Sequence, residues 1–223
     1  VKYIFLSLYY ATLAFQSIIN EINNKYAKHI ITIEDPIEFV YNQDRCIINQ
    51  REIGADCESF SSALRVALRE DPDVILIGEL RDLATIRLAL TAAETGHLVL
   101  ATLHTNDAAS AVTRLTDMGI EPFLLSSSLL GVLAQRLVRK LCTACHGSGC
   151  PHCAQTGYAG RTGIFELLVA TDPIRAQIHN RAAEADLRAT ALAQGMVLMR
   201  DDGQRLVDAG ITSAEELLRV TRE

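Results

Sequence analysis

Two short, unbroken apolar runs do most to constrain the fold of this chain, because each one ends in polar residues. The runs are 74–77 (VILI) and 98–101 (LVLA), and such runs are typical of strands buried on both faces of a parallel sheet. The first leads into Glu79, and the second leads into Thr102 and His104. Because ligands of open α/β sheets bind beyond the carboxyl ends of the strands, we expect Glu79 and His104 to share one site. Phosphoanhydride hydrolysis needs a held Mg²⁺ and an oriented water, and a carboxylate at a strand end suits either task.

Length and composition fit one large domain, or a core with a small satellite. The chain has 223 residues, of which 49% are hydrophobic and 5% aromatic, with no tryptophan, so the core is aliphatic. The formal net charge is −6 and no lysine or arginine run is present. Nucleic-acid binding needs a concentrated basic surface, so we expect no nucleic-acid partner, and a nucleic-acid translocase is disfavoured.

The apolar opening, VKYIFLSLYYATLAFQSII, raises the question of a signal or membrane segment. The chain begins with valine, lacks an A-x-A cleavage site, and interrupts the run with Ser7, Thr12 and Gln16. A spanning helix needs about 20 apolar residues. We therefore expect no targeting segment here.

Alternating helix and strand patterns predict a parallel sheet with crossover helices. A buried-type strand at 29–33 ends at Pro36, and residues 37–57 read as an irregular, partly extended connection. Asp82 is a good N-cap with Gly96 as terminator, and Asn106 or Asp107 can cap the next helix. The predicted helices of the first part are 12–25, 59–70, 82–95, 106–118 and 123–137.

After a segment rich in Cys, Gly, His and Ser at 142–161, the chain returns to regular patterns. Residues 163–169 (GIFELLV) predict a strand, and Ser213 with Glu216 forms a capping-box pattern. Short helices are expected at 173–180, 183–194, 200–209 and 213–222. The division predicted is a core at 1–140, a tetracysteine insert at 141–162, and a C-terminal strand and helical domain at 163–223.

Four of the six cysteines form a C-x2-C-x4-C-x2-C cluster, which is the most self-sufficient signal in the chain. Two such knuckles can hold Zn²⁺ in a tetrahedral S4 site, and clustering of this kind is typical of a reducing compartment. Redox C-x-x-C chemistry is the alternative, and His146 and His152 are possible substitute ligands. The predicted ligands are Cys142, Cys145, Cys150 and Cys153.

Other polar groups have plain structural interpretations as well as functional ones. Glu34 opens an acidic turn after the 29–33 strand, and such turns are common. His97 and His104 flank the 98–101 run from opposite ends, so both cannot touch one phosphate. Arg65 and Arg69 lie opposite the apolar face of their helix, where a solvated face is the ordinary interpretation and a clamp on a neighbouring subunit's phosphate is the other.

Taken together, three long motifs and the cysteine segment resemble those of the bacterial secretion and pilus motor ATPases. ITIEDPIEF (31–39) is similar to the family's Asp box, DPDVILIGELRD (71–82) to its Walker B motif, and TGHLVLATLHTNDA (95–108) to its His box. The CTAC…CPHC…TGYAGRTGIFELL run (142–168) resembles the zinc-bearing C-terminal part of the secretion and pilus-assembly branch, as does the ending GITSAEELLRVTRE.

The resemblance implies a RecA-like P-loop NTPase core, ATP with Mg²⁺, Zn²⁺ in the cysteine segment, and a homo-hexamer. It also implies a cytoplasmic protein, peripheral at the inner membrane, that docks on inner-membrane platform and docking proteins. By resemblance, Glu34, Glu79 and His104 are catalytic. The arginines that match those used around nucleotide and at subunit contacts are Arg65, Arg69, Arg81 and Arg161, and His97 joins the nucleotide-binding set.

One motif of the family is missing from this chain. The slot for G-x-x-x-x-G-K-[ST], just before the first predicted helix, is occupied by residues 3–10, which contain no glycine or lysine. Backbone amides and a lysine that cradle phosphates are therefore absent. The chain resembles the C-terminal portion of a motor, truncated or joined to an unrelated start, and we expect it to bind ATP poorly by itself. The alternatives are a catalytically inactive, zinc-stapled docking or assembly module and a pilus retraction ATPase.

Overall fold

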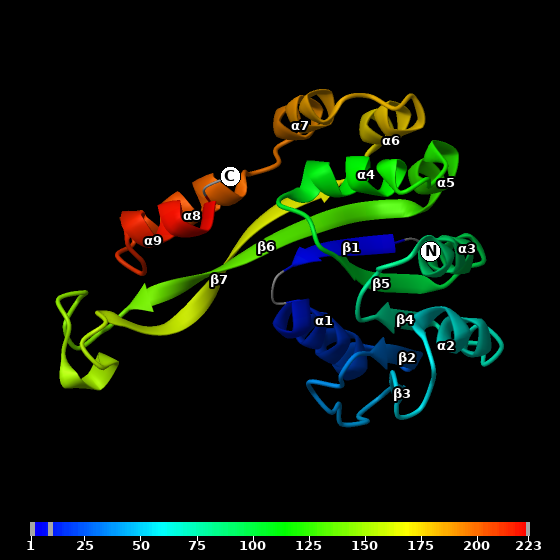
Figure 1. The fold of residues 1–223 in the computed structure, drawn as a ribbon, viewed down its shortest axis with the longest axis horizontal. Coiled ribbons are helices and arrows are strands. Elements are labelled where there is room, and N and C mark those ends of the chain that lie inside the picture. The colour runs from blue at the N-terminus through cyan, green and yellow to red at the C-terminus, as the bar shows by residue number, and fades with distance from the viewer. Residues whose placement is uncertain (1–2, 9–10, 222–223) are drawn as a thin grey trace.

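A seven-stranded sheet runs through the computed structural model, which describes residues 3–8 and 11–221 (Figure 1). The strand order is β3-β2-β4-β5-β1-β6-β7. The strands are β1 Tyr3–Leu8, β2 His29–Glu34, β3 Ile47–Glu52, β4 Val74–Ile77, β5 Leu98–Leu103, β6 Leu129–Leu141 and β7 Tyr158–Val169. The α-helices are α1 Ala11–Lys25, α2 Phe60–Ala67, α3 Leu83–Glu94, α4 Ala108–Asp117, α5 Pro122–Ser128, α6 Asp172–His179, α7 Glu184–Ala193, α8 Met199–Asp208 and α9 Ala214–Thr221, and η1 Pro151–Cys153 is a 3-10 turn.

Six strands are parallel, and β7 pairs antiparallel with β6. Because β1, β2, β4 and β5 run in the same direction, their last residues lie along one edge of the sheet, which we call the carboxyl edge. The connections after β2, β4 and β5 therefore begin there. The predicted α/β class, a largely parallel sheet with flanking helices, is confirmed.

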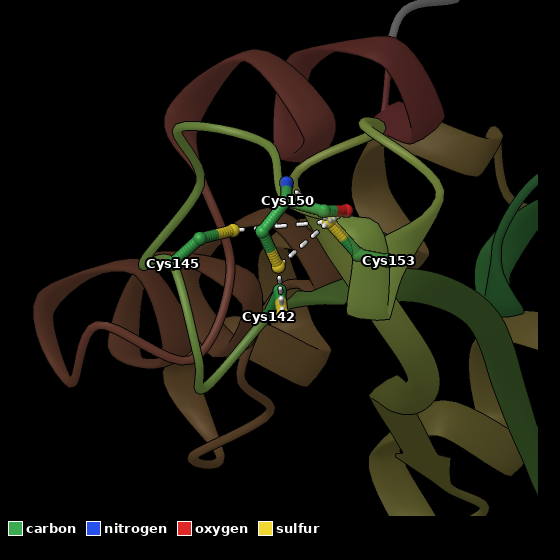
Figure 2. Close-up of side chains that lie close together, drawn as sticks. All are labelled: Cys142, Cys145, Cys150 and Cys153. Carbon is green, nitrogen blue, oxygen red and sulfur yellow. Dashed lines mark hydrogen bonds between the residues drawn. The ribbon is translucent and has the colours of Figure 1, made fainter.

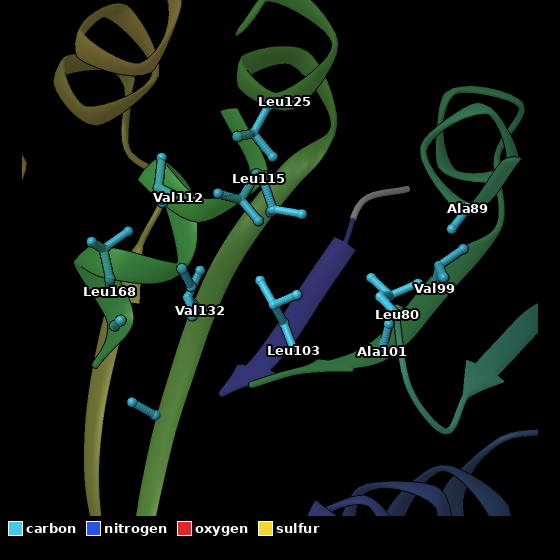
Figure 3. Packing of buried hydrophobic residues seen from close by; sticks show 14 of the residues in the cluster. Leu80, Ala89, Val99, Ala101, Leu103, Val112, Leu115, Leu125, Val132 and Leu168 are labelled. Carbon is cyan, nitrogen blue, oxygen red and sulfur yellow. The ribbon is translucent and has the colours of Figure 1, made fainter. Parts of the chain in front are cut away.

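Both faces of the sheet are covered, which explains the unbroken apolar runs. Side chains alternate between the two faces of a strand. On one face, Ile30, Val74 and Leu76 pack with Phe15 and Ile19 of α1. On the other face, the intervening strand residues pack against the remaining helices in a larger cluster. Figure 3 shows part of it: Leu80, Ala89, Val99, Ala101, Leu103, Val112, Leu115, Leu125, Val132 and Leu168.

The helix predicted at 123–137 is wrong over most of its length. Helix α5 ends at Ser128, and the chain continues as the long strand β6. Glycine at position 131 permits this close pairing, because a Cβ there would lie 2.7 Å from the carbonyl oxygen of Leu168 on β7. Pairing with β1 on one side and β7 on the other overrides the helix-forming residues of this segment.

Two further strands were not predicted from the sequence patterns. Residues 47–52, within the connection expected to be irregular and partly extended, form β3, which extends the sheet beside β2. Residues 3–8, expected to replace the phosphate loop, form β1 in the middle of the sheet, while residues 9–10 lie outside the described part. The division at 140 and 163 stays a prediction, and β7 pairs with β6 across it.

Several predicted helix ends are confirmed. Asp82 caps α3 by accepting a hydrogen bond from the Thr85 amide at 2.8 Å, and Asp107 caps α4 in the same way through Ser110. The capping box at Ser213 is only half formed. The Ser213 hydroxyl accepts from the Glu216 amide at 3.1 Å, while the Glu216 carboxylate instead accepts from Arg139 and Arg219.

Among the described residues, the helices are too short or too polar for any of them to span a bilayer. Beyond the sheet, β6 and β7 continue as a long hairpin whose tip holds the cysteine segment, at the far left of Figure 1. Helices α4 to α9 lie along one side of this hairpin (Figure 1).

Candidate functional site

Glu79 lies just beyond the end of β4, and the side chains of an arginine and a histidine meet it there. Arg81 Nε lies 2.7 Å from one carboxylate oxygen, and His104 Nε2 lies 3.0 Å from the other. The Glu79 side chain is 21% exposed, whereas that of His104 is 59% exposed. The carboxylate is therefore held in place from both sides while its partners face solvent.

The loop that carries Glu79 is tied to both neighbouring strands. The Gly78 amide donates to the Ile33 carbonyl of β2 at 2.7 Å, and the Leu80 amide donates to the Thr102 carbonyl of β5 at 3.0 Å. The Thr102 hydroxyl also donates to the Gly78 carbonyl. A Cβ at Gly78 would come within 3.2 Å of the Ile33 oxygen, so glycine lets β4 leave the sheet this close to β2.

Glu34 ends β2 on the same edge, in a more buried setting. It is 8% exposed and accepts from the Thr32 hydroxyl at 2.6 Å and from Gln50 Nε2 at 3.1 Å. The next residue, Asp35, lies 3.7 Å from Arg81. Arg81 thus bridges the two acidic segments. The carboxylates of Glu79 and Asp35, with the Arg81 guanidinium between them, can polarise water or complete the coordination shell of a hard metal ion such as Mg²⁺.

A cavity of about 510 Å³ opens beside α1 near the carboxyl edge. Gln135 of β6 lines it, and although this residue is only 5% exposed, its Oε1 has no hydrogen-bond partner within the described part of the chain. Aromatic rings and polar groups share the rest of the wall. Its other lining residues include Gln16, Ser17, Glu38, Phe39, Arg161, Thr162 and Phe165. Arg161 of the predicted set is therefore found here, apart from the Glu79 cluster.

Three predicted residues are not brought to either place. His97 precedes β5, so it lies at the opposite edge of the sheet, with its Nδ1 2.8 Å from the Ala92 carbonyl oxygen. Arg65 and Arg69 are exposed in the last turn of α2 and just after it, and neither forms an ion pair with a described residue. Their assignment to a nucleotide site stays a prediction, which only a neighbouring chain could satisfy.

The four clustered cysteines do come together at the tip of the hairpin (Figure 2). Their sulfurs all lie within 4.8 Å of one another, with Cys142–Cys150 at 3.9 Å and both Cys145–Cys153 and Cys150–Cys153 at 3.7 Å. A tetrahedral zinc with Zn–S bonds of about 2.3 Å requires sulfur separations of about 3.8 Å. The residues present therefore fit a closed S4 zinc site.

The backbone around Cys153 favours the thiolate form of that residue. The amides of Cys150 and Gly157 donate to Cys153 Sγ at 3.3 and 3.2 Å. Although burial alone would raise the pKa of the Cys153 thiol, these donors and the neighbouring thiols of Cys150 and Cys145 lower it to about 6. Backbone donors also lower the pKa of the Cys150 thiol, but burial and the thiols of Cys145 and Cys153 outweigh them and raise it to about 11. A Cβ on Gly157 would lie 2.4 Å from the Gly147 carbonyl oxygen, so this glycine permits the close crossing of the two knuckles. His146 and His152 are exposed and lie outside the four-sulfur group.

Sequence patterns alone missed several groups that hold the site. Gln50 of β3 links Glu34 to the Phe39 carbonyl, yet β3 itself was not predicted. Glu166 of β7 is 3% exposed and accepts from the Ala108 amide at 3.1 Å, at the start of the helix that follows His104. The available signal for Glu166 was a carboxylate inside an apolar strand, where a buried charge needs specific partners.

Comparison with known proteins gives one family match and several long, similar chains. The family described as "Type II/IV secretion system protein" matches residues 11–219. The type II secretion system protein HxcR of Pseudomonas aeruginosa is 57% identical over 204 residues, covering 87% of this chain and 43% of that protein. The type II secretion system ATPase E of Vibrio cholerae is 46% identical over 230 residues, covering 90% and 44%. The chain thus spans less than half the length of these relatives.

Solved structures share the fold. The pilus retraction motor PilT with bound ADP superposes with a TM-score of 0.84 at 36% identity, covering 100% of this chain and 62% of that one. The Legionella pneumophila ATPase DotB superposes with a TM-score of 0.80 at 25% identity, covering 98% and 59%. Both similarities extend over nearly the whole described chain.

Proposed function

The chain belongs to the type II/IV secretion system protein family, and from this we propose that it forms the hydrolytic part of an ATP-driven motor for type II secretion or type IV pilus assembly. The observation that carries the proposal is the Glu79 carboxylate, fixed between His104 at 3.0 Å and Arg81 at 2.7 Å on the carboxyl edge. A residue held in this way suits the orientation of an attacking water. Names of the relatives favour secretion over pilus retraction, since the secretion proteins are 57% and 46% identical and PilT is 36% identical.

In this proposal the acidic residues divide the work. Glu79 orients or deprotonates the water, Glu34 and its neighbour Asp35 complete the environment of the Mg²⁺ that accompanies ATP, and His104 contacts the phosphate end. The cavity beside α1 accommodates the rest of the nucleotide, with Arg161 and the unpartnered Gln135 oxygen offering polar contacts and Phe165 an apolar surface. These roles rest on the family and on the grouping of the residues.

The sequence of residues 3–10 limits what this chain can do unaided. In parallel sheets of this type a phosphate-binding loop follows the central strand, and here residues 3–10 offer neither glycine nor lysine. We therefore propose that the 223-residue chain hydrolyses ATP negligibly. The same observation favours a second candidate function, a zinc-stapled docking or assembly module without catalysis.

One experiment separates the two functions. Residues 3–10 are replaced by the corresponding segment of the Vibrio cholerae relative, giving a loop-restored chain, and ATP turnover is measured for both proteins. We expect turnover only in the loop-restored chain, and Glu79→Gln in it should lower kcat at least a hundredfold while leaving ATP binding within a few-fold. The exposed Glu94 of α3 supplies the control, because Glu94→Gln should leave turnover unchanged.

Turnover by the unaltered chain would contradict the reasoning about residues 3–10. Normal turnover in the Glu79→Gln protein would contradict the role of Glu79. A loop-restored chain that binds ATP without hydrolysing it would favour the docking module.

We also propose that the tetracysteine group binds one Zn²⁺ per chain. Four thiolates leave no open coordination position, so the metal supplies structure rather than chemistry. It staples a hairpin tip that contributes little apolar packing of its own. Elemental analysis of the purified chain should find zinc near one equivalent, and its absence from protein prepared with zinc would contradict the assignment.

Assembly is the last part of the proposal. Because Arg65 and Arg69 point away from the core and have no ion-pair partner in the described chain, a neighbouring subunit's phosphate is a suitable ligand. We propose a cytoplasmic homo-hexamer, peripheral at the inner membrane and docked on platform and docking proteins. Sedimentation of the loop-restored chain with a non-hydrolysable ATP analogue tests the ring, and a monomer under all conditions would count against it.

A further inference from the structure

The connection between β5 and α4, residues 104–107, carries His104 and is bound in part by residues far along the sequence. Arg188 of α7 donates to the Asp107 carboxylate at 2.8 Å. Arg136 of β6 donates to the Asn106 carbonyl at 3.3 Å and also to the Val220 carbonyl of α9. Helices α7 and α9 are thus tied to this connection by side chains.

Glu166 provides the tie to α8, and its geometry is unusual. One carboxylate oxygen accepts from the amide of Ala108 and the other from the amide of Met199, both at 3.1 Å. These are the first residues of α4 and α8. The first amides of a helix have no partner within the helix and carry its positive end. One buried carboxylate therefore caps two helices from opposite oxygens.

No cationic side chain shares this carboxylate: within the described part of the chain, every ion pair involves other groups. Glu166 is 3% exposed and borders a cavity of about 420 Å³ with Arg136 and Arg188, whose guanidinium groups are bound to other partners. The hydrogen-bond donors to the Glu166 carboxylate among the described residues are accordingly the first amides of the two helices. The hydrogen bonds to Ala108 and to Met199 need the same rotamer of the Glu166 side chain. Loss of the bond to Met199 in α8 therefore frees the rotamer that directs the second oxygen to Ala108 in α4.

We propose that Glu166 is a positioning residue that makes the placement of His104 beside Glu79 depend on the seating of α8 against the sheet. A displacement of α8 frees the Glu166 side chain, loosens the first turn of α4, and so loosens the connection that holds His104. The C-terminal helices thereby regulate the hydrolytic site. This consequence for hydrolysis rests on the proposed function, whereas the mechanical link does not.

The link is tested on the 223-residue chain by removing one N–H group at α8. Proline is accepted at the first position of a helix, and Leu198, with φ −65° and ψ 146°, already has the conformation that precedes proline. Met199→Pro therefore deletes the donor to Glu166 and the methionine side chain. Met199→Ala, the matched control, deletes the side chain and keeps the donor.

Amide hydrogen exchange at residues 104–110, followed by mass spectrometry, gives the readout. Met199 lies outside this segment, so the substitution does not change its sequence. A hydrogen bond to a charged group is strong enough that its loss accelerates local exchange about tenfold or more. We expect that acceleration at 104–110 in Met199→Pro relative to Met199→Ala, with exchange in β2 and β4 unchanged. Equal exchange at 104–110 in the two variants, or an increase spread evenly over the sheet, overturns the proposal.

A second variant acts at the carboxylate itself. Glu166→Gln keeps the shape but has one acceptor oxygen, so it can cap only one of the two helices. Exchange should rise in the first turn of α4 or of α8 and stay unchanged in α2, and an unaltered pattern in both turns overturns the proposal.

In the loop-restored chain, Met199→Pro should lower kcat about tenfold relative to Met199→Ala while KM for ATP changes less than threefold, since His104 is one of several groups proposed to contact the nucleotide and the others are unchanged. If the exchange effect is found and the loop-restored chain is inactive in every version, the link stands and the proposed function fails. If turnover is normal in Met199→Pro, the regulatory role is overturned.

Discussion

Glu216 offers the sharpest quantitative test of the structure. It lies in α9 with a side chain of 0% exposure, yet it is a carboxylate. One oxygen accepts from the Arg139 amide at 3.0 Å, and the other accepts from Arg139 Nε and Nη2 at 3.0 and 2.7 Å. Arg219 donates to both oxygens at 2.7 Å. This carboxylate joins α9 to β6 close to the hairpin tip that carries the cysteines.

The magnitude follows from its proton affinity. Hydrogen bonding by Arg219 lowers the pKa of Glu216 most, burial opposes this, and Arg139 lowers it further, so that it falls from 4.5 to about 2. Each tenfold change in proton affinity corresponds to about 1.4 kcal/mol, so the ionised carboxylate stabilises the folded state by about 3 kcal/mol. A lowered folded-state pKa means that this stability is fully present above pH 4.5 and is lost as pH falls toward 2.

Glu216→Gln imitates the protonated acid, and the comparison with the unaltered chain isolates this one group. Urea unfolding should give a free energy of unfolding about 3 kcal/mol lower for the variant at pH 7. The difference should shrink as pH falls below 4.5 and nearly vanish near pH 2. Glu215→Gln, at the exposed neighbour in α9, should change the free energy by less than about 0.5 kcal/mol. A difference under 1 kcal/mol at pH 7, or one that does not vary with pH, would refute the reasoning.

Three other predictions follow from packing and assembly. Cys153→Ser should abolish stoichiometric zinc binding and raise amide exchange within 142–157. Strands β2 and β4 should stay protected, because the main apolar cluster includes no residue of 142–157. Cys57→Ser is the control, and global unfolding of Cys153→Ser would contradict the prediction. Gly131→Ala should destabilise the chain by about 1–3 kcal/mol in thermal unfolding, since a Cβ would lie 2.7 Å from the Leu168 carbonyl oxygen; an unchanged melting temperature would show that β6 can move. In the loop-restored chain, Arg69→Ala should lower ATP turnover while changing ATP affinity no more than a few-fold. Mixing Arg69→Ala subunits with Glu79→Gln subunits should recover some activity. No recovery in the mixture, together with normal turnover by Arg69→Ala alone, would mean that Arg65 and Arg69 only form a solvated helix face.

The grouping of the candidate site residues could be predicted from the sequence because each residue belongs to a short contiguous motif. An unbroken apolar run followed by a carboxylate implies a buried strand that ends at a binding edge, and Glu34, Glu79 and His104 are found at that edge. The cysteine spacing brings four sulfurs to one point for a similar reason, since two C-x2-C turns fold locally. Caps at Asp82 and Asp107 are also local, and they too were predicted.

Only the tertiary structure decided features that depend on partners distant in sequence. The segment that forms β6 has helix-forming residues, and its strand conformation is set by β1 and β7 on either side. Strand β3 exists because β2 offers it an edge. The partners of Glu166 and Glu216 could not be predicted from the sequence, because the helix ends and guanidinium groups that bind these carboxylates lie near them only in the folded chain.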